Sequence, residues 1–284
     1  MAIGRAAALL FVAGATLALS GYQLPPHKDG LFSYSKVLET RGGGDEVIDY
    51  DAKRDILARD KVAGKRVHSK YVSSVMPWHR KARKYAGAGG RKHSMYVVGK
   101  AKSPRIAVVF VHGRNGTHRL GVKDHIFGGN FNRLQNLMIK GRGRYYSPTF
   151  SDFGARGTRD MSALLARIER EAPRAFVVLA CGSTGANLCW NLARDPQAKR
   201  RVDGMVFVGG VWDEKAVGAS DVPVVIAHGG KDSLYPVERM RRFANDLRSG
   251  GQDVRFLEFA TGGHGTPIRM IDWRRELNWL LSHQ

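Results

Sequence analysis

Cysteine and acidic side chains are scarce in this chain of 284 residues. Two cysteines are too few for a disulfide scaffold or, by themselves, for a four-ligand zinc site. Aspartate and glutamate number 25 against 46 lysines and arginines, which gives a formal net charge of +21. With 43% hydrophobic residues the chain is still too apolar for a disordered basic tail, and it is long enough to bury a substantial core.

Motifs that would explain so much positive charge are also missing. The sequence has no helix-turn-helix, zinc finger or aromatic-studded RNA-binding strand, so we expect no nucleic-acid partner. The ten histidines include no pair at the spacing of metal ligands on a helix. We therefore expect neither a metal nor another cofactor.

The N-terminus has the layout of a secretory signal peptide. A short positive start ends at Arg5, residues 6–19 are uncharged, and the small residues Ala18 and Ser20 stand at the −3 and −1 positions of a cleavage site. The uncharged run has 14 residues, fewer than the roughly 20 that a membrane span needs. We predict a cleaved signal over residues 1–20 and a secreted or periplasmic protein. An uncleaved anchor and an ordinary buried helix are the alternatives.

Most of the positive charge lies in one segment. Residues 52–106 contain 16 lysines and arginines and 2 acidic residues, a net charge of +14. We expect residues 21–93 to form a basic, partly flexible N-terminal extension, with a glycine-rich connector at 41–44 and helices over 51–62 and 71–85. In an exported protein this charge favours an anionic membrane surface or an acidic polysaccharide as the partner of residues 52–106. A solvated basic surface without a partner is the alternative.

Residues 94–284 alternate between predicted strands and helices. Strands are expected at 95–98, 106–111, 145–150, 176–180, 205–208, 224–227 and 254–259. Apolar residues at helical spacing mark 131–138, 161–168, 183–193, 237–247 and 270–281. This alternation predicts an α/β fold with a mostly parallel central sheet and helices on both faces. Ligands of such sheets bind at the carboxyl ends of the strands.

Ser183 is a candidate nucleophile, because the strand at 176–180 runs directly into a helix through Gly-Ser-Thr-Gly. A serine in so tight a turn exposes its hydroxyl group, and a serine N-cap is the alternative interpretation. Cys181 is a weaker candidate, since a thiol inside the strand is usually buried and inert. A disulfide between Cys181 and Cys189 is conceivable, but we expect the distance from a strand end to the middle of a helix to be too wide.

Asp232 and His264 complete a candidate catalytic set. Each follows a predicted strand, and the chain order is Ser, Asp, His. A serine hydroxyl needs a general base, and the base needs a carboxylate that fixes its tautomer and stabilises the imidazolium. We predict His264 as the base and Asp232 as the orienting acid, with Asp213 as the alternative acid.

Two backbone N–H groups are candidates to bind an oxyanion. Arg114 follows an apolar strand two positions after His112, and Thr184 comes directly after Ser183. Both amides can therefore point into one cleft, where they would stabilise developing negative charge. His112 itself is expected to be structural. The side chains of Arg114 and His118 would favour an anionic group on the substrate.

With these motifs, residues 94–284 resemble the α/β-hydrolase-fold serine hydrolases, and more narrowly the phospholipase and carboxylesterase type. The resemblance is carried by His112-Gly113, Gly182-Ser183-Thr184-Gly185, His228-Gly-Gly-Lys-Asp232 and Gly263-His264. It implies the α/β-hydrolase fold and the residue roles given above. One position departs from the family's usual Gly-x-Ser-x-Gly elbow, because Cys181 stands at its first glycine.

The resemblance also implies a function and an open site. The connection between the strands at 205–208 and 224–227 is too short for a large cap domain, so the site is open unless residues 21–93 or the loop 117–128 fold over it. We predict an exported serine hydrolase that cleaves a carboxylic ester of a small molecule or lipid through an acyl-enzyme, as an esterase, lipase or lysophospholipase does. The alternatives are an amidase or peptidase with the same triad and a non-catalytic polyanion- or envelope-binding protein on this fold.

Overall fold

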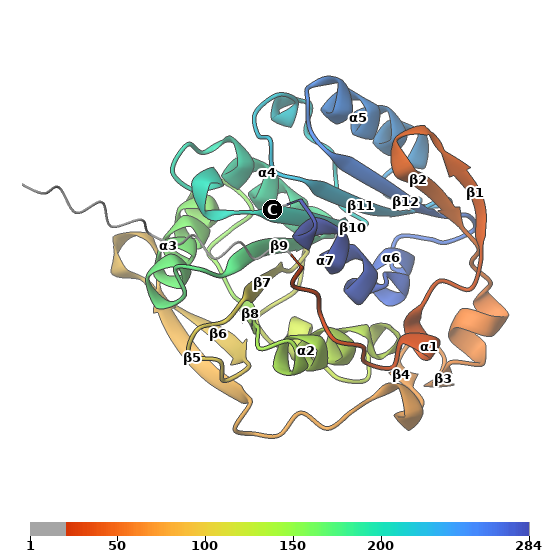
Figure 1. The fold of residues 1–284 in the computed structure, drawn as a ribbon, viewed down its shortest axis with the longest axis horizontal. Coiled ribbons are helices and arrows are strands. Elements are labelled where there is room, and N and C mark those ends of the chain that lie inside the picture. The colour runs from red at the N-terminus through yellow and green to blue at the C-terminus, as the bar shows by residue number, and fades with distance from the viewer. Residues whose placement is uncertain (1–20, 284) are drawn as a thin grey trace, which may run out of the picture.

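The computed structural model describes residues 21–283, which are built around a sheet of 10 strands (Figure 1). The strand order is β1-β2-β12-β11-β10-β9-β7-β8-β6-β5. The predicted signal peptide at residues 1–20 lies outside the described residues. Within the described chain, no helix is both long enough and apolar enough to cross a bilayer.

The sheet is parallel through its centre and antiparallel at both edges. Its strands are β1 Val37–Arg41, β2 Asp45–Ile48, β5 Arg80–Ala86, β6 Lys92–Val98, β7 Ile106–Val111, β8 Arg144–Pro148, β9 Phe176–Gly182, β10 Gly204–Val208, β11 Val224–Gly229 and β12 Val254–Phe259. The run β8, β7, β9, β10, β11, β12, β2 is parallel, whereas β1, β6 and β5 pair antiparallel with their neighbours. Every residue of β7, β9, β10 and β11 is buried, which explains why their sequences are continuous apolar runs.

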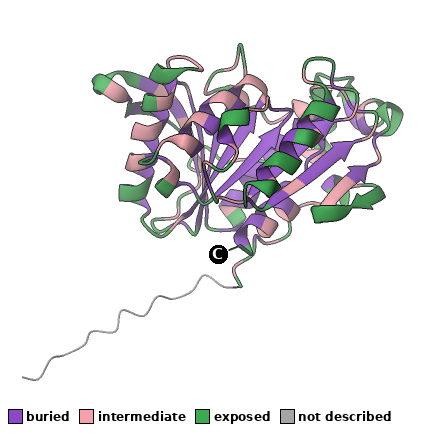
Figure 2. Ribbon diagram, turned by 90° about the horizontal axis from the view of Figure 1, so that it is seen from above, coloured by how far each residue is buried: buried purple, intermediate pink, exposed green. Residues whose placement is uncertain are grey.

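Helices cover both faces of the sheet. They are α1 Asp29–Phe32, α2 Asn130–Lys140, α3 Ala155–Glu171, α4 Ala186–Arg194, α5 Val237–Ser249, α6 Thr266–Met270 and α7 Trp273–Leu281. The apolar sides of α3, α4 and α5 pack in one core cluster, and those of α2, α6 and α7 pack in a second cluster on the other face. Figure 2 shows the strands as a buried layer between helices with exposed outer sides. The predicted fold class is confirmed.

No cap domain lies between β10 and β11. Residues 209–223 connect the two strands and contain, as regular structure, the 3₁₀ turn Glu214–Ala216. The carboxyl end of the sheet is therefore left uncovered at this connection, as the sequence predicted.

The helix predicted at 51–62 is present only in part, and the helix predicted at 71–85 is wrong. The first stretch contains a single π-helical turn, Lys53–Leu57, and then β3 (Asp60–Val62), which forms a hairpin with β4 (Arg66–Val67). The second stretch contributes most of β5, which pairs with β6 along its full length. Because β5 is an edge strand with mostly exposed side chains, its sequence carries no apolar alternation that local analysis could detect.

Residues 21–93 do not form the separate extension that we expected. The glycine-rich residues 41–44 form the turn between β1 and β2, where Gly43 and Gly44 have φ angles of 77° and 80° in the left-handed region. β2 then pairs in parallel with β12, so this hairpin extends one edge of the sheet. β5 closes the opposite edge, and its exposed lysines and arginines discourage pairing with another chain.

The same N-terminal segment buries the polar side of α2. Ser73 N donates to Asn132 Oδ1, and Asn132 Nδ2 donates to Ser73 O, both over 2.8 Å. The fully buried side chain of Arg133 lies 3.1 Å from Asp29 and 2.8 Å from Asp272. Buried polar groups need such partners because an unpaired one costs free energy. The N-terminal residues thus belong to the same folded unit as the helices around the sheet.

Candidate active site

Ser183 occupies a strained turn between β9 and α4. Its φ angle is 50°, in the left-handed region that residues other than glycine rarely adopt. The chain must also pass very close to the end of β7. A Cβ atom on Gly185 would lie 2.5 Å from Val111 O, and one on Gly113 would lie 2.9 Å from Ser183 Cβ. Only glycine fits at these two positions, and the sequence has glycine at both. The chain can therefore form the strained turn at Ser183 so close to the end of β7.

The structure brings the three predicted catalytic side chains together from three different loops. Ser183 follows β9, Asp232 follows β11 and His264 follows β12. His264 Nε2 lies 2.8 Å from Ser183 Oγ, and His264 Nδ1 lies 2.8 Å from Asp232 Oδ2. With a proton on Nδ1 donated to the carboxylate, Nε2 is free to accept the proton of the serine hydroxyl.

Asp232 is held as a carboxylate although its side chain is fully buried. Burial alone would raise its pKa, but hydrogen bonds from His264 and from the amides of Tyr235 and Leu234 lower the pKa below its usual value. The two amides donate to Oδ1 over 3.1 and 2.9 Å, which leaves Oδ2 for His264. A charged, fixed acceptor of this kind orients the imidazole and stabilises its protonated form.

His228 supports the Asp232 loop, a role that sequence analysis did not assign. Its ring is buried, and burial lowers its pKa, so the neutral ring donates from Nε2 to Tyr235 O over 2.8 Å. The same nitrogen lies 3.6 Å from Asp232 Oδ2. In the sequence, the motif at residues 228–232 was the one feature that could have indicated this role of His228. The alternative acid Asp213 lies apart, where it accepts from Lys215 N and pairs with Arg194.

The two residues whose amides are predicted to bind an oxyanion, Arg114 and Thr184, are neighbours of Ser183 in the cavity and in the chain. Arg114 and Ser183 line the same cavity, and no acceptor among residues 21–283 occupies the Arg114 N–H. Thr184 is the first residue after the serine, at the start of a helical turn whose N–H groups lack intrahelical partners. His112 is buried and its ring stacks on Phe150 at 4.4 Å between centroids, as expected for a structural side chain.

A cavity of about 320 Å³ adjoins Ser183 and His264. Its remaining lining residues are mostly apolar: Phe110, Gly113, Arg114, Leu120, Phe127, Phe131, Gly182, Val208, Leu234, Gly265 and Ile268. Leu120 and Phe127 come from the loop 117–128, so this loop forms part of the cavity wall. An apolar cavity beside a candidate nucleophile suits an apolar substrate group.

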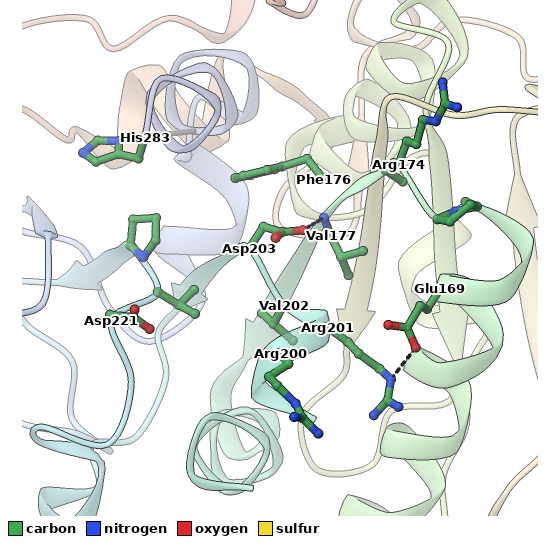
Figure 3. A pocket seen from close by; sticks show the side chains of 15 residues that line it. Glu169, Arg174, Phe176, Val177, Arg200, Arg201, Val202, Asp203, Asp221 and His283 are labelled. Carbon is green, nitrogen blue, oxygen red and sulfur yellow. Dashed lines mark hydrogen bonds and ion pairs between the residues drawn. The ribbon is translucent and has the colours of Figure 1, made fainter. Parts of the chain in front are cut away.

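A larger cavity, of about 560 Å³, lies at the other end of the sheet (Figure 3). Its lining includes Phe176, which begins β9, whereas Ser183 follows the end of that strand. Asp203 in this cavity accepts a hydrogen bond from Val177 N over 2.7 Å, and Arg201 pairs with Glu169 over 2.7 Å. These charged groups already have partners, and none is a serine, so this cavity is not the candidate active site.

The N-terminal segment braces the wall of the cavity beside Ser183. Arg59 Nη2 donates to Gly128 O over 2.8 Å, next to Phe127 in the cavity wall. Asp60 accepts two hydrogen bonds, of 3.0 and 2.7 Å, from Arg269, the neighbour of Ile268 in that wall. Sequence analysis gave neither Arg59 nor Asp60 a role, because nothing local shows that they meet residues 69 and 209 positions away.

Cys181 and Cys189 form a disulfide, so the expectation that they lie too far apart is wrong. Their Cα atoms are 6.5 Å apart, within the range of native disulfides, and both residues are fully buried. The 3₁₀ turn Ser183–Gly185 is tight, and it folds the start of α4 back toward the end of β9. The bond excludes Cys181 as a free thiol nucleophile and ties the strand before Ser183 to the helix after it.

Replacing both cysteines by alanine is expected to lower the free energy of unfolding by about 2–3 kcal/mol, because the bond closes a short loop in the unfolded chain. The two cysteines are 8 positions apart. Urea unfolding followed by circular dichroism measures the change. A thiol reductant should lower the midpoint of the parent chain and leave that of the double variant unchanged. Equal reductant sensitivity of both proteins would show that no such bond forms.

The fold is similar to that of solved hydrolases. An esterase from Pyrococcus furiosus is 12% identical over 75% of this chain and 97% of its own, with a TM-score of 0.59. Esterase 2 from Thermogutta terrifontis is 16% identical over 73% of this chain and 92% of its own, with a TM-score of 0.53. A serine hydrolase without a lid from Xanthomonas campestris is 16% identical over 74% of this chain and 97% of its own, with a TM-score of 0.53.

At these identities the likeness shows the fold alone. Neither a scan of protein-family models nor a search of curated protein sequences finds a match. The chain therefore has the α/β-hydrolase fold, as the motifs predicted. Within that fold, the described residues place no cap domain between β10 and β11, and the N-terminal segment adds strands to both edges of the sheet.

Proposed function

We propose that this protein is an exported serine hydrolase that cleaves a carboxylic ester through an acyl-enzyme. The observation that carries the proposal is the continuous hydrogen-bonded chain from Ser183 Oγ through His264 to the buried Asp232 carboxylate, beside an apolar cavity. A nucleophile, a base and an orienting acid in this geometry are suited to acyl transfer, and this supports the proposal. The names of the structural neighbours, two of them esterases, support the same reaction class.

The proposed reaction has two halves. In the first, Ser183 Oγ attacks the ester carbonyl carbon while His264 Nε2 takes the serine proton, and the amides of Arg114 and Thr184 hydrogen-bond the oxyanion. His264 then gives this proton to the departing alcohol, which leaves an acyl group on Ser183. In the second half His264 takes a proton from water while the water oxygen attacks the acyl carbon. His264 then gives that proton to Ser183 Oγ as the bond from the acyl carbon to Oγ breaks, so the carboxylic acid leaves and the free serine is restored. Asp232 stays ionised and stabilises protonated His264 throughout.

The cavity supports a substrate with a short or medium apolar acyl chain. Its volume of about 320 Å³ corresponds to roughly ten groups the size of a methylene. Each group is counted as about 30 Å³, which is close to the volume of one water molecule in the liquid. The lining presents few polar side chains other than Arg114, and this composition favours a neutral alkyl group.

Export is supported by two independent features. Residues 1–20 have the composition of a signal peptide, and disulfides persist mainly in oxidising compartments outside the cytosol. The bond between Cys181 and Cys189 therefore fits a secreted or periplasmic protein.

A fluorophosphonate probe tests the proposal directly. The probe phosphonylates an activated serine, and we expect stoichiometric labelling on the peptide that contains Ser183. The Thermogutta terrifontis esterase was itself solved in a form phosphonylated by cyclosarin. Labelling should disappear in Ser183→Ala and persist in Ser74→Ala, a change at an exposed serine. Well-folded protein that resists the probe would refute the enzyme and favour a non-catalytic binding protein. Labelled protein that cleaves amides faster than matched esters would favour an amidase.

A further inference from the structure

The positive charge near the active site is not balanced by acidic residues of its own segment. Between residues 61 and 123 the sequence contains no aspartate and no glutamate. Lys61, Lys65 and Arg66 of the hairpin formed by β3 and β4 are exposed, as is Lys70 just after it. Among residues 21–283, none of these four forms an ion pair with a carboxylate. Four unpaired cations within ten positions produce a strong local positive potential.

Large apolar side chains are exposed in the same segment. Leu57, Val62, Met76 and Trp78 are 61, 47, 41 and 46% exposed. They make up half of the exposed large apolar side chains of the described chain, although they fall between residues 57 and 78. Exposure of apolar side chains to water is unfavourable. Single apolar residues scattered over a surface are common and need no explanation, but several in one segment do. Three of these side chains, Val62, Met76 and Trp78, lie in the acid-free segment, so this segment offers both apolar contact and positive charge.

This surface, residues 57–78, is fixed to the rest of the molecule. Val67 N donates to His125 O over 2.9 Å, and Ser73 exchanges two hydrogen bonds with Asn132 of α2. Arg80 then ties the end of the segment to Gln135 of α2 over 2.9 Å. Figure 1 shows the segment following the periphery of the molecule from β4, past α2, to β5. The exposed apolar side chains are therefore presented on an ordered backbone.

The surface adjoins the candidate active site through Arg59. Its guanidinium lies between the rings of Phe32 and Tyr71, 4.7 Å from each centroid, and donates to Gly128 O beside Phe127 of the cavity wall. β3 begins at the next residue. The hairpin that carries the cations is thus anchored directly to the wall of the cavity beside Ser183.

We propose that residues 57–78 dock the protein on an anionic lipid bilayer. Lysine and arginine side chains contact the anionic headgroups, while the apolar side chains of Val62, Met76 and Trp78 enter the interfacial layer. Tryptophan is enriched at this depth of a membrane, and a basic surface with apolar anchors binds anionic bilayers by both effects. An acidic polysaccharide would use the cations and would leave the apolar side chains without a partner. The bilayer therefore accounts for both observations.

Vesicle binding tests this proposal separately from catalysis. The full chain with Ser183→Ala is sedimented with vesicles of phosphatidylglycerol and phosphatidylcholine in equal parts, so that no lipid is hydrolysed. We expect binding that weakens in high salt, and at least about tenfold weaker binding after Lys61→Glu with Lys65→Glu. Trp78→Ser should weaken binding about threefold or more. Every variant keeps residues 1–20, so the differences in binding between variants measure what the docking surface contributes.

The matched control reverses two exposed arginines elsewhere. Arg170 lies at the end of α3, and Arg174 lines the large cavity at the opposite end of the sheet. Their double change to glutamate alters the net charge equally and should change binding less than about twofold. Equal loss in both double variants would mean that net charge alone drives binding, and the proposal would fail.

Tryptophan fluorescence provides a second readout. Vesicles should protect the chain from acrylamide quenching, and this protection should be smaller in Trp78→Phe because the indole of Trp78 no longer contributes. Binding to alginate as tight as to anionic vesicles, with no protection of Trp78, would replace the bilayer with a polysaccharide. No binding to anionic vesicles at low salt would overturn the proposal whether or not the protein hydrolyses esters.

Discussion

Ser183→Ala is expected to lower kcat for ester hydrolysis by about 10⁴- to 10⁶-fold, because the variant has no oxygen to form the acyl-enzyme. The activity that remains would come from the oxyanion amides and from substrate binding. Hydrolysis of p-nitrophenyl esters of increasing acyl length measures the loss, and the same panel reports which chain fills the cavity beside Ser183. Removal of the hydroxyl relieves rather than creates crowding, so we expect the thermal midpoint to stay close to that of the parent chain.

The two candidate acids provide the control for this prediction. Asp232→Asn keeps the shape of the side chain but removes the charge that faces His264 Nδ1 at 2.8 Å, so we expect a loss of about 10⁴-fold in kcat. Asp213→Asn should retain nearly full activity, because Asp213 pairs with Arg194 away from the serine. Full activity in Ser183→Ala, or a larger loss in Asp213→Asn than in Asp232→Asn, would contradict the assigned roles.

Asp60→Asn is expected to lower the free energy of unfolding by about 3–5 kcal/mol, the largest effect on stability that we expect. The side chains of Asp60 and Arg269 are 0 and 6% exposed, so the variant leaves the Arg269 charge buried without its counter-charge. Urea unfolding gives the change. Because Arg269 neighbours Ile268 in the cavity wall, KM for esters should rise more than kcat falls.

A surface ion pair supplies the matched comparison. Arg239 and Glu214 lie 2.8 Å apart with side chains 51 and 65% exposed, so Glu214→Gln should cost less than about 1 kcal/mol. In the double variant Asp60→Leu with Arg269→Met neither charge remains, and a large part of the lost stability should return. A loss in Asp60→Asn as small as in Glu214→Gln would show that the buried pair does not hold the N-terminal segment in place.

The sequence alone was sufficient for the fold class and for the residues that meet in the candidate site. Apolar runs such as β7 and β9 are visible in the sequence because central parallel strands are buried on both faces. Apolar residues at helical spacing mark α3 and α5 because each of these helices buries one side. Ser183, Asp232 and His264 each follow such a strand, and parallel strands bring their carboxyl ends to one edge. Their proximity therefore followed from the fold class.

Only the tertiary structure decided what residues 21–93 do. β5 is an exposed edge strand that is defined by its pairing with β6, and the polar side of α2 is buried because Ser73 and Asp29 supply partners from far away in the chain. The contact between Asp60 and Arg269 and the disulfide that follows from the tight elbow at Ser183 are likewise set by three-dimensional position. Local patterns report burial along one element, whereas these features depend on which distant residue lies opposite.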